Sequence, residues 1–143
     1  TIHISGGDEM LKAANLSKSN TKILGVSILT SLNSNQTEKF FFNNDINNIV
    51  SNFTKYALNN NLDGIVCSPK EIKIIKKIVS NKLLIITTGI RPTNYRDSKD
   101  DQKRTMTPKE AIDAGANYLV IGRPITNSLN PLEALQSINS SLE

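Results

Sequence analysis

Short apolar runs alternate with helix-patterned segments along this 143-residue chain. Each run is nearly continuous instead of alternating with polar residues, which is typical of a strand that is buried on both faces. A segment with helical spacing of apolar residues follows each run, so the pattern predicts successive strand–helix units and a parallel sheet. The expected strands are Thr1–Ile4, Lys22–Leu29, Gly64–Cys67, Leu83–Thr87 and Tyr118–Ile121.

Several of the expected helices begin at clear capping signals. Asp45 can cap a helix that continues to about Asn59, and Ser68 followed by a proline can cap the next one. Thr107, Pro108 and Glu110 form a cap, a first-turn proline and a capping-box partner. The sequence also predicts helices at Asp8–Leu16 and from Pro131 to about Ser140, and a helix that begins at Pro124. The helix that begins after Thr107 should end at Gly115, and polar loops are expected at Thr30–Thr37 and Thr88–Thr105.

Five strand–helix units fit two α/β architectures. They could form an open, doubly wound sheet, or they could be the last five βα units of an eight-stranded (β/α)₈ TIM barrel. The chain begins at Thr1, inside an expected strand, and this favours the barrel. We therefore expect residues 1–143 to be a single domain that forms the C-terminal part of a TIM barrel.

Composition excludes several classes of protein. The net charge is only +4. Nucleic-acid binding would require a basic face with interleaved aromatic residues, and the sequence shows neither feature. The longest apolar runs, such as Leu83–Ile86, are too short to cross a membrane, and no signal-peptide pattern opens the sequence. One cysteine, Cys67, and one histidine, His3, exclude a disulfide framework and a Cys/His metal site. These features favour a reducing cytoplasm, and we expect both residues to be packed in the core.

Glycine and arginine follow two neighbouring strands of the predicted sheet. Thr87–Pro92 contains Gly89 and Arg91, and Ile121–Pro124 contains Gly122 and Arg123. In TIM barrels, phosphate groups commonly bind at the loops after the last two strands. Glycine allows close approach to the backbone and arginine offers a bidentate fork, so the two strand ends predict a phosphate site. The alternative is two unrelated turns with surface arginines.

The segment Thr93–Thr105 is long and polar for a simple connection. It can be a lid that closes over a phosphate, or a solvated loop. Gln102 lies in the middle of its charged residues, which are Arg96, Asp97, Lys99, Asp100, Asp101, Lys103 and Arg104.

Three motifs stand out in this region: Gly89-Ile-Arg-Pro92, Asp101-Gln-Lys-Arg-Thr-Met-Thr-Pro108 and Ile121-Gly-Arg-Pro-Ile-Thr126. Together they resemble the closing signature of the bacterial-type orotidine 5′-phosphate decarboxylase family. Earlier stretches agree with the same family, and Thr88 is a departure because the family usually has proline there. These stretches are His3-Ile-Ser-Gly-Gly7, Ile28-Leu-Thr-Ser31 and Leu62-Asp-Gly-Ile-Val-Cys-Ser68.

The resemblance implies a homodimeric TIM barrel that converts orotidine 5′-monophosphate to UMP and CO₂ without a metal or cofactor. By the same resemblance, Arg91, Arg123 and the Gly122 N–H would bind the 5′-phosphate. Gln102 would reach both phosphate and base, and Thr30 would contact the edge of the pyrimidine.

The family's catalytic Asp-x-Lys-x-x-Asp motif is absent from the 143 residues. The stretch from Asp97 through Lys99 begins in the same way, but Gln102 stands where the motif needs its second aspartate. We therefore expect no catalytic residue in this chain and expect an N-terminal portion of the barrel, from the same precursor or a separate chain, to supply the lysines. The alternatives are a non-catalytic phosphate-ligand module and another phosphate-handling barrel enzyme of the same superfamily.

Overall fold

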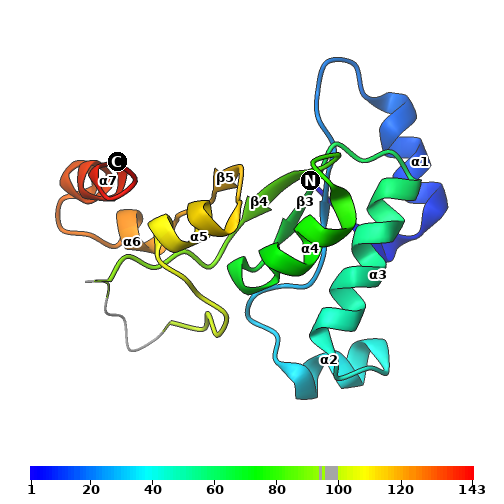
Figure 1. The fold of residues 1–143 in the computed structure, drawn as a ribbon, viewed down its shortest axis with the longest axis horizontal. Coiled ribbons are helices and arrows are strands. Elements are labelled where there is room, and N and C mark those ends of the chain that lie inside the picture. Colours follow the sequence, from blue (N-terminus) through cyan, green and yellow to red (C-terminus); the bar gives the residue numbers. More distant parts are fainter. Residues whose placement is uncertain (94, 96–99) are drawn as a thin grey trace.

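The computed structural model describes residues 1–93, 95 and 100–143. Its centre is a five-stranded parallel sheet, as the apolar runs predict, and the strands lie in chain order (Figure 1). The strands are β1 (Ile2–His3), β2 (Leu24–Val26), β3 (Gly64–Cys67), β4 (Leu84–Thr87) and β5 (Tyr118–Leu119).

The capping signals place the helices correctly. Asp45 accepts a hydrogen bond from the Asn48 N–H at the start of α3, and Thr107 and Glu110 form a capping box at the start of α5. Gly115 ends α5 at a φ of 111°, a conformation that favours glycine. The helices are α1 (Asp8–Ser17), α2 (Ser34–Phe41), α3 (Ile46–Asn59), α4 (Ile72–Val79), α5 (Pro108–Ala114), α6 (Arg123–Thr126) and α7 (Pro131–Ser140), with 3₁₀ turns η1 (Ile4–Gly6) and η2 (Pro69–Glu71).

The structure corrects part of the expected pattern. The loop expected at Thr30–Thr37 contains the start of α2, which is capped by Asn33. The segment after Ser68 begins as the 3₁₀ turn η2 before it continues as α4. The strands β1, β2 and β5 are shorter than the apolar runs that predict them.

The two faces of the sheet have different surroundings. Ile65 and Ile85 point to one face and are at most 2% exposed, packed in one core with Val50 of α3 and Ile75 of α4. The strand register places a row of other side chains opposite, and Tyr118 at its end is 59% exposed. This row, called the open face below, consists of His3, Val26, Val66, Ile86 and Tyr118.

The open face favours a barrel wall over a doubly wound sheet, because a doubly wound sheet carries helices on both faces. A cavity of about 440 Å³ lies against it, lined among others by His3, Val26, Val66 and Ile86. The expectation that His3 is a core residue is wrong, because its side chain is exposed on the edge strand at this face. Cys67 is buried, as expected.

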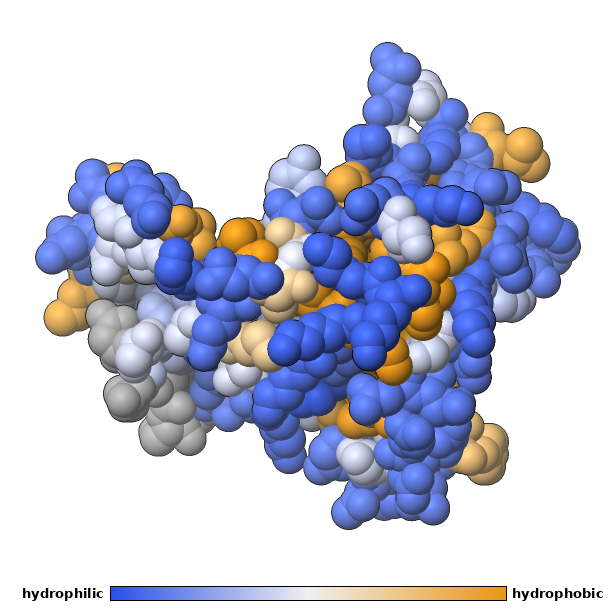
Figure 2. Space-filling view, in the orientation of Figure 1, coloured by the Kyte–Doolittle hydropathy of each residue, from blue (hydrophilic) through white to orange (hydrophobic). Residues whose placement is uncertain are grey.

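Hydrophilic side chains cover most of the surface seen in Figure 2, and apolar surface shows between them near the centre. Among the helices of the described residues, none is long and apolar enough to span a membrane.

Candidate functional site

The predicted site residues lie at one rim of the sheet. All five strands are parallel, so their carboxyl ends meet at the same edge. Thr30 follows β2, Arg91 follows β4, and Gly122 and Arg123 follow β5. Gln102 comes from the long segment between β4 and α5, and the contacts described next bring it to the same rim.

Two arginines from neighbouring strand ends converge on one carboxylate. Asp100 accepts from Arg91 Nε at 2.5 Å and from Arg91 Nη2 at 2.8 Å, which is a bidentate fork. Arg123 Nη2 lies 3.1 Å from the same carboxylate and 2.6 Å from Asp101 Oδ1. The pair can therefore bind a single small anion with oxygen acceptors, and Asp100 occupies that role here.

This cluster changes the acidity of its members. The hydrogen bonds from Arg91 hold the pKa of Asp100 down at about 2, although partial burial opposes the shift. The hydrogen bond from Arg123 lowers the pKa of Asp101 and, reciprocally, raises the pKa of Arg123. Both carboxyl groups are ionised at neutral pH, so the arginines face negative charge.

Thr30 and Gln102 meet beside the arginines. The Thr30 hydroxyl donates to Gln102 Oε1, and both residues line the cavity against the open face. Gly89 allows this approach, because a Cβ added there would lie 3.1 Å from the Arg104 carbonyl and 3.4 Å from Gln102 Oε1. Its φ of 73° also favours glycine.

Gly122 is the residue before a single helical turn. The turn α6 begins at Arg123, one residue before the expected Pro124, and the Ile125 N–H donates to the Gly122 carbonyl at 2.8 Å. A Cβ added at Gly122 would meet no atom within 4 Å, so crowding does not explain this glycine. Because α6 is only four residues long, we assign no helix-dipole effect to it.

The long segment after β4 is attached to the body of the protein at both ends. The Arg91 N–H donates to the Met106 carbonyl at 2.9 Å, and Ile90 and Met106 form an isolated bridge. Arg104, expected among the lid's charges, is instead 8% exposed and paired with Glu71. Sequence reasoning missed Glu71, although its capping box with Ser68 was a readable signal. Arg96, Asp97 and Lys99 lie outside the described residues.

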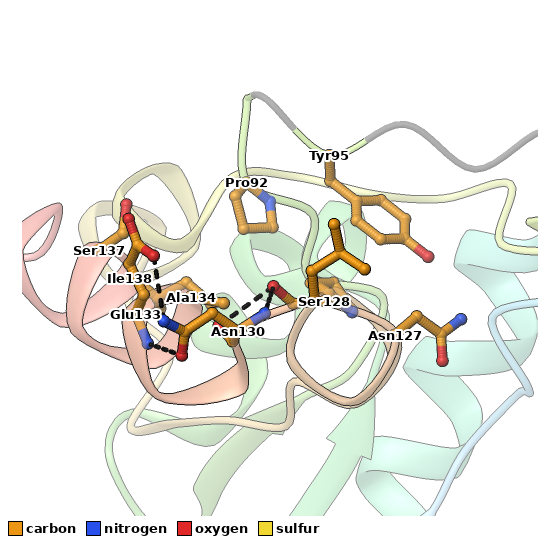
Figure 3. A pocket seen from close by; sticks show the side chains of 11 residues that line it. Pro92, Tyr95, Asn127, Ser128, Asn130, Glu133, Ala134, Ser137 and Ile138 are labelled. Carbon is orange, nitrogen blue, oxygen red and sulfur yellow. Dashed lines mark hydrogen bonds between the residues drawn. The ribbon is translucent and has the colours of Figure 1, made fainter.

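A second cavity of about 500 Å³ lies between the segment after β4 and helices α6 and α7 (Figure 3). Its polar side chains are already used for local structure. Asn130 caps α7 by accepting from the Glu133 N–H at 3.2 Å, and its amide donates to the Glu133 carboxylate. The arginine pair is therefore a stronger candidate for a ligand site than this cavity.

The structure gives little support to two other kinds of site, a cysteine nucleophile and a metal centre. Burial raises the pKa of the Cys67 thiol far above its ordinary value, so the thiol is a poor nucleophile. In the part of the chain that the structure describes, no group of three or more His, Cys, Asp or Glu side chains could hold a metal ion.

Comparisons with known proteins place the whole chain in one group. The model of the orotidine 5′-phosphate decarboxylase / HUMPS family matches residues 1–138. An orotidine 5′-phosphate decarboxylase of Coxiella burnetii (strain RSA 493 / Nine Mile phase I) is 41% identical over 148 aligned residues, covering 99% of this chain and 62% of the relative. One from Dictyoglomus thermophilum is 39% identical, covering the entire chain and 62% of the relative.

Solved structures agree on the fold. The crystal structure of orotidine 5′-phosphate decarboxylase from Lactobacillus acidophilus matches with a TM-score of 0.77 and 29% identity, over 100% of this chain and 63% of that one. The enzyme from Pyrococcus horikoshii OT3 matches with a TM-score of 0.71 at 23% identity, over 99% of this chain and 59% of that one, and supports the fold alone. The chain spans about three fifths of these relatives' length, and its five βα units follow the TIM-barrel fold. The protein belongs to the orotidine 5′-phosphate decarboxylase / HUMPS family.

Proposed function

We propose that this chain carries the phosphate-binding and base-binding part of an orotidine 5′-monophosphate decarboxylase, the carbon–carbon lyase that forms UMP and CO₂ in pyrimidine biosynthesis. The observation that carries the proposal is the convergence of Arg91 and Arg123 on one carboxylate, beside the Thr30–Gln102 contact. Two guanidinium groups from adjacent strand ends suit a dianionic 5′-phosphate. The relatives near 40% identity favour this decarboxylase over other enzymes of the family.

In the proposed complex each residue has a separate role. Arg91 and Arg123 bind the phosphate, with the Gly122 N–H beside them. Thr30 contacts the base across the cavity at the open face, and Gln102 reaches both the phosphate and the base. The phosphate is remote from the bond that breaks, so its binding energy positions the reacting pyrimidine. The lysine that protonates the product carbanion belongs to the Asp-x-Lys-x-x-Asp motif, which these 143 residues lack.

The remaining parts of the proposal concern assembly. An N-terminal portion of the same barrel, on one precursor or a separate chain, supplies the catalytic lysines, and the complete enzyme is a homodimer in the cytoplasm. No metal or cofactor takes part. The support is the family membership, the coverage of about three fifths of the relatives and the open face of the sheet.

The test of the site is nucleotide binding by the purified chain. Replacing Arg123 with alanine should weaken UMP binding by about 2–4 kcal/mol, because a charged hydrogen-bonding contact to the phosphate is lost. Isothermal titration calorimetry measures the affinity, and Lys109→Ala is the matched control because Lys109 is exposed on α5, away from the arginine pair.

Unchanged UMP affinity in Arg123→Ala would refute the assignment of the site. UMP binding by a chain that no N-terminal portion can activate would indicate a non-catalytic phosphate-ligand module instead.

A further inference from the structure

A buried ion pair joins three segments, two of which carry the proposed base-binding residues Thr30 and Gln102. Arg104 Nη1 donates to Glu71 Oε1, and Arg104 Nη2 donates to the Leu29 carbonyl at 2.9 Å. One guanidinium group therefore links the turn after β3, the segment after β2 and the long segment after β4.

The partner carboxylate is itself held in place. Glu71 Oε2 accepts from the Ser68 N–H at 2.9 Å, and the Ser68 hydroxyl donates to the Arg104 carbonyl at 3.1 Å. Ser68, Glu71 and Arg104 thus form a closed ring of hydrogen bonds through side-chain and backbone groups, and they are 0%, 2% and 8% exposed. Burial raises the pKa of Glu71, while Arg104 and the Ser68 N–H oppose that rise.

The ring lies directly beside the residues proposed to read the base. Leu29 precedes Thr30, and Arg104 follows Gln102 by two positions, so the ring fixes the backbone next to both members of the Thr30–Gln102 hydrogen bond. Gly89 lies close to the Arg104 carbonyl as well. In contrast, among the described residues the side chains of Arg91 and Arg123 contact Ile90, Asp100 and Asp101, and none of these contacts joins the ring.

We infer that Glu71 and Arg104 are positioning residues for recognition of the pyrimidine base. This inference rests on the proposed function, since it concerns the same site. A buried ion pair is a weak source of net stability, because desolvation offsets most of the attraction, whereas its fixed geometry can hold neighbouring groups in register. Because the ring holds the backbone next to Thr30 and Gln102 and does not contact the two arginines, its loss should weaken base binding more than phosphate binding.

The experiment compares two ligands that share a phosphate. UMP and ribose 5-phosphate are titrated calorimetrically into the chain and into the variants Arg104→Lys and Glu71→Gln. Arg104→Lys retains the charge but cannot reach Glu71 and Leu29 together, and Glu71→Gln keeps the shape without the charge. We expect UMP affinity to fall about three- to tenfold, as for the loss of one well-placed hydrogen bond, with ribose 5-phosphate affinity changed less than about twofold.

Glu38→Gln is the control for the loss of a carboxylate at an exposed position, and it should leave both affinities unchanged. Equal losses for both ligands, unchanged UMP binding in both variants, or unfolding of both variants would overturn the inference and leave the pair a purely structural role. Failure of the proposed function gives a different result, because the unmodified chain would then bind neither ligand.

Discussion

Asp100 lies between the two guanidinium groups that are proposed to bind phosphate. It accepts two hydrogen bonds from Arg91 and lies 3.1 Å from Arg123, and its side chain is only 15% exposed. A phosphate that engages both arginines must displace this carboxylate. The observed affinity for phosphate therefore depends on how much more strongly the arginines bind phosphate than they bind the Asp100 carboxylate.

The Asp100→Asn variant should bind phosphate ligands more tightly than the unmodified chain. The amide keeps the shape of the side chain but removes the competing charge, and a partly exposed ion pair of this kind is worth about 1 kcal/mol, or about fivefold in affinity. Titration with ribose 5-phosphate measures the change, and Asp113→Asn on the exposed side of α5 is the control. Weaker binding would show instead that Asp100 organises the arginines.

At the residue scale, the sequence singled out the arginines, Gln102 and Thr30, which the structure brings to one rim, but it did not indicate the contacts of the carboxylates Asp100 and Glu71. Arg91 and Arg123 stand in motifs with glycine just after strands, and residues at the carboxyl ends of parallel strands all lie at the same edge of the sheet. Asp100 belongs to a polar segment without periodicity, so the sequence does not indicate where its side chain lies. Glu71 has the helix-start position of a solvent-facing capping residue, and only its long-range pairing with Arg104, 33 positions away, reveals its burial.

At the scale of elements, helix starts were predictable and strand lengths were not. The caps at Asp45 and Thr107 are local hydrogen bonds, so they can be recognised in the sequence. A strand ends where its partner ends, and the run Lys22–Leu29 keeps only Leu24–Val26 paired with β3. Helix α2 was missed because its segment is polar, although Asn33 and Gln36 form a full capping box.

Replacing Asn33 with alanine should lower the free energy of unfolding by about 1 kcal/mol, because the Asn33 side chain accepts from the Gln36 N–H and its removal breaks the capping box at the start of α2. Urea denaturation followed by circular dichroism measures the loss. Asn35→Ala, an exposed position in the same turn, is the control and should be neutral or slightly stabilising. Equal stability of both variants would mean that the cap does not hold α2 in place.

At the scale of the whole molecule, the sequence left a doubly wound sheet and a barrel wall both open, because a continuous apolar run does not say what covers each face. The register resolves this question. Ile65 and Ile85 pack under helices, while the open face from His3 to Ile86 lines a cavity that reaches Thr30 and Gln102. The proposed base-binding residues therefore lie where the open face meets the rim.

This arrangement makes the open face the surface on which the proposed N-terminal portion would close the barrel. We expect the 143-residue chain alone not to decarboxylate orotidine 5′-monophosphate, and we expect activity when a polypeptide containing the Asp-x-Lys-x-x-Asp motif is added. Tyr118→Asp should prevent that activation, because a carboxylate buried at the new contact without a partner is strongly unfavourable. Since Tyr118 is 59% exposed, the variant chain should still fold by itself.

Leu16→Asp is the matched control, since Leu16 is 87% exposed on α1, away from the open face, and should leave activation intact. The assay follows loss of the substrate's ultraviolet absorbance, and thermal unfolding confirms that each variant is folded. Decarboxylation by the chain alone would contradict the proposed division of the site. Full activation of Tyr118→Asp would show that the added portion covers another surface, because the charge at Tyr118 would then remain in water.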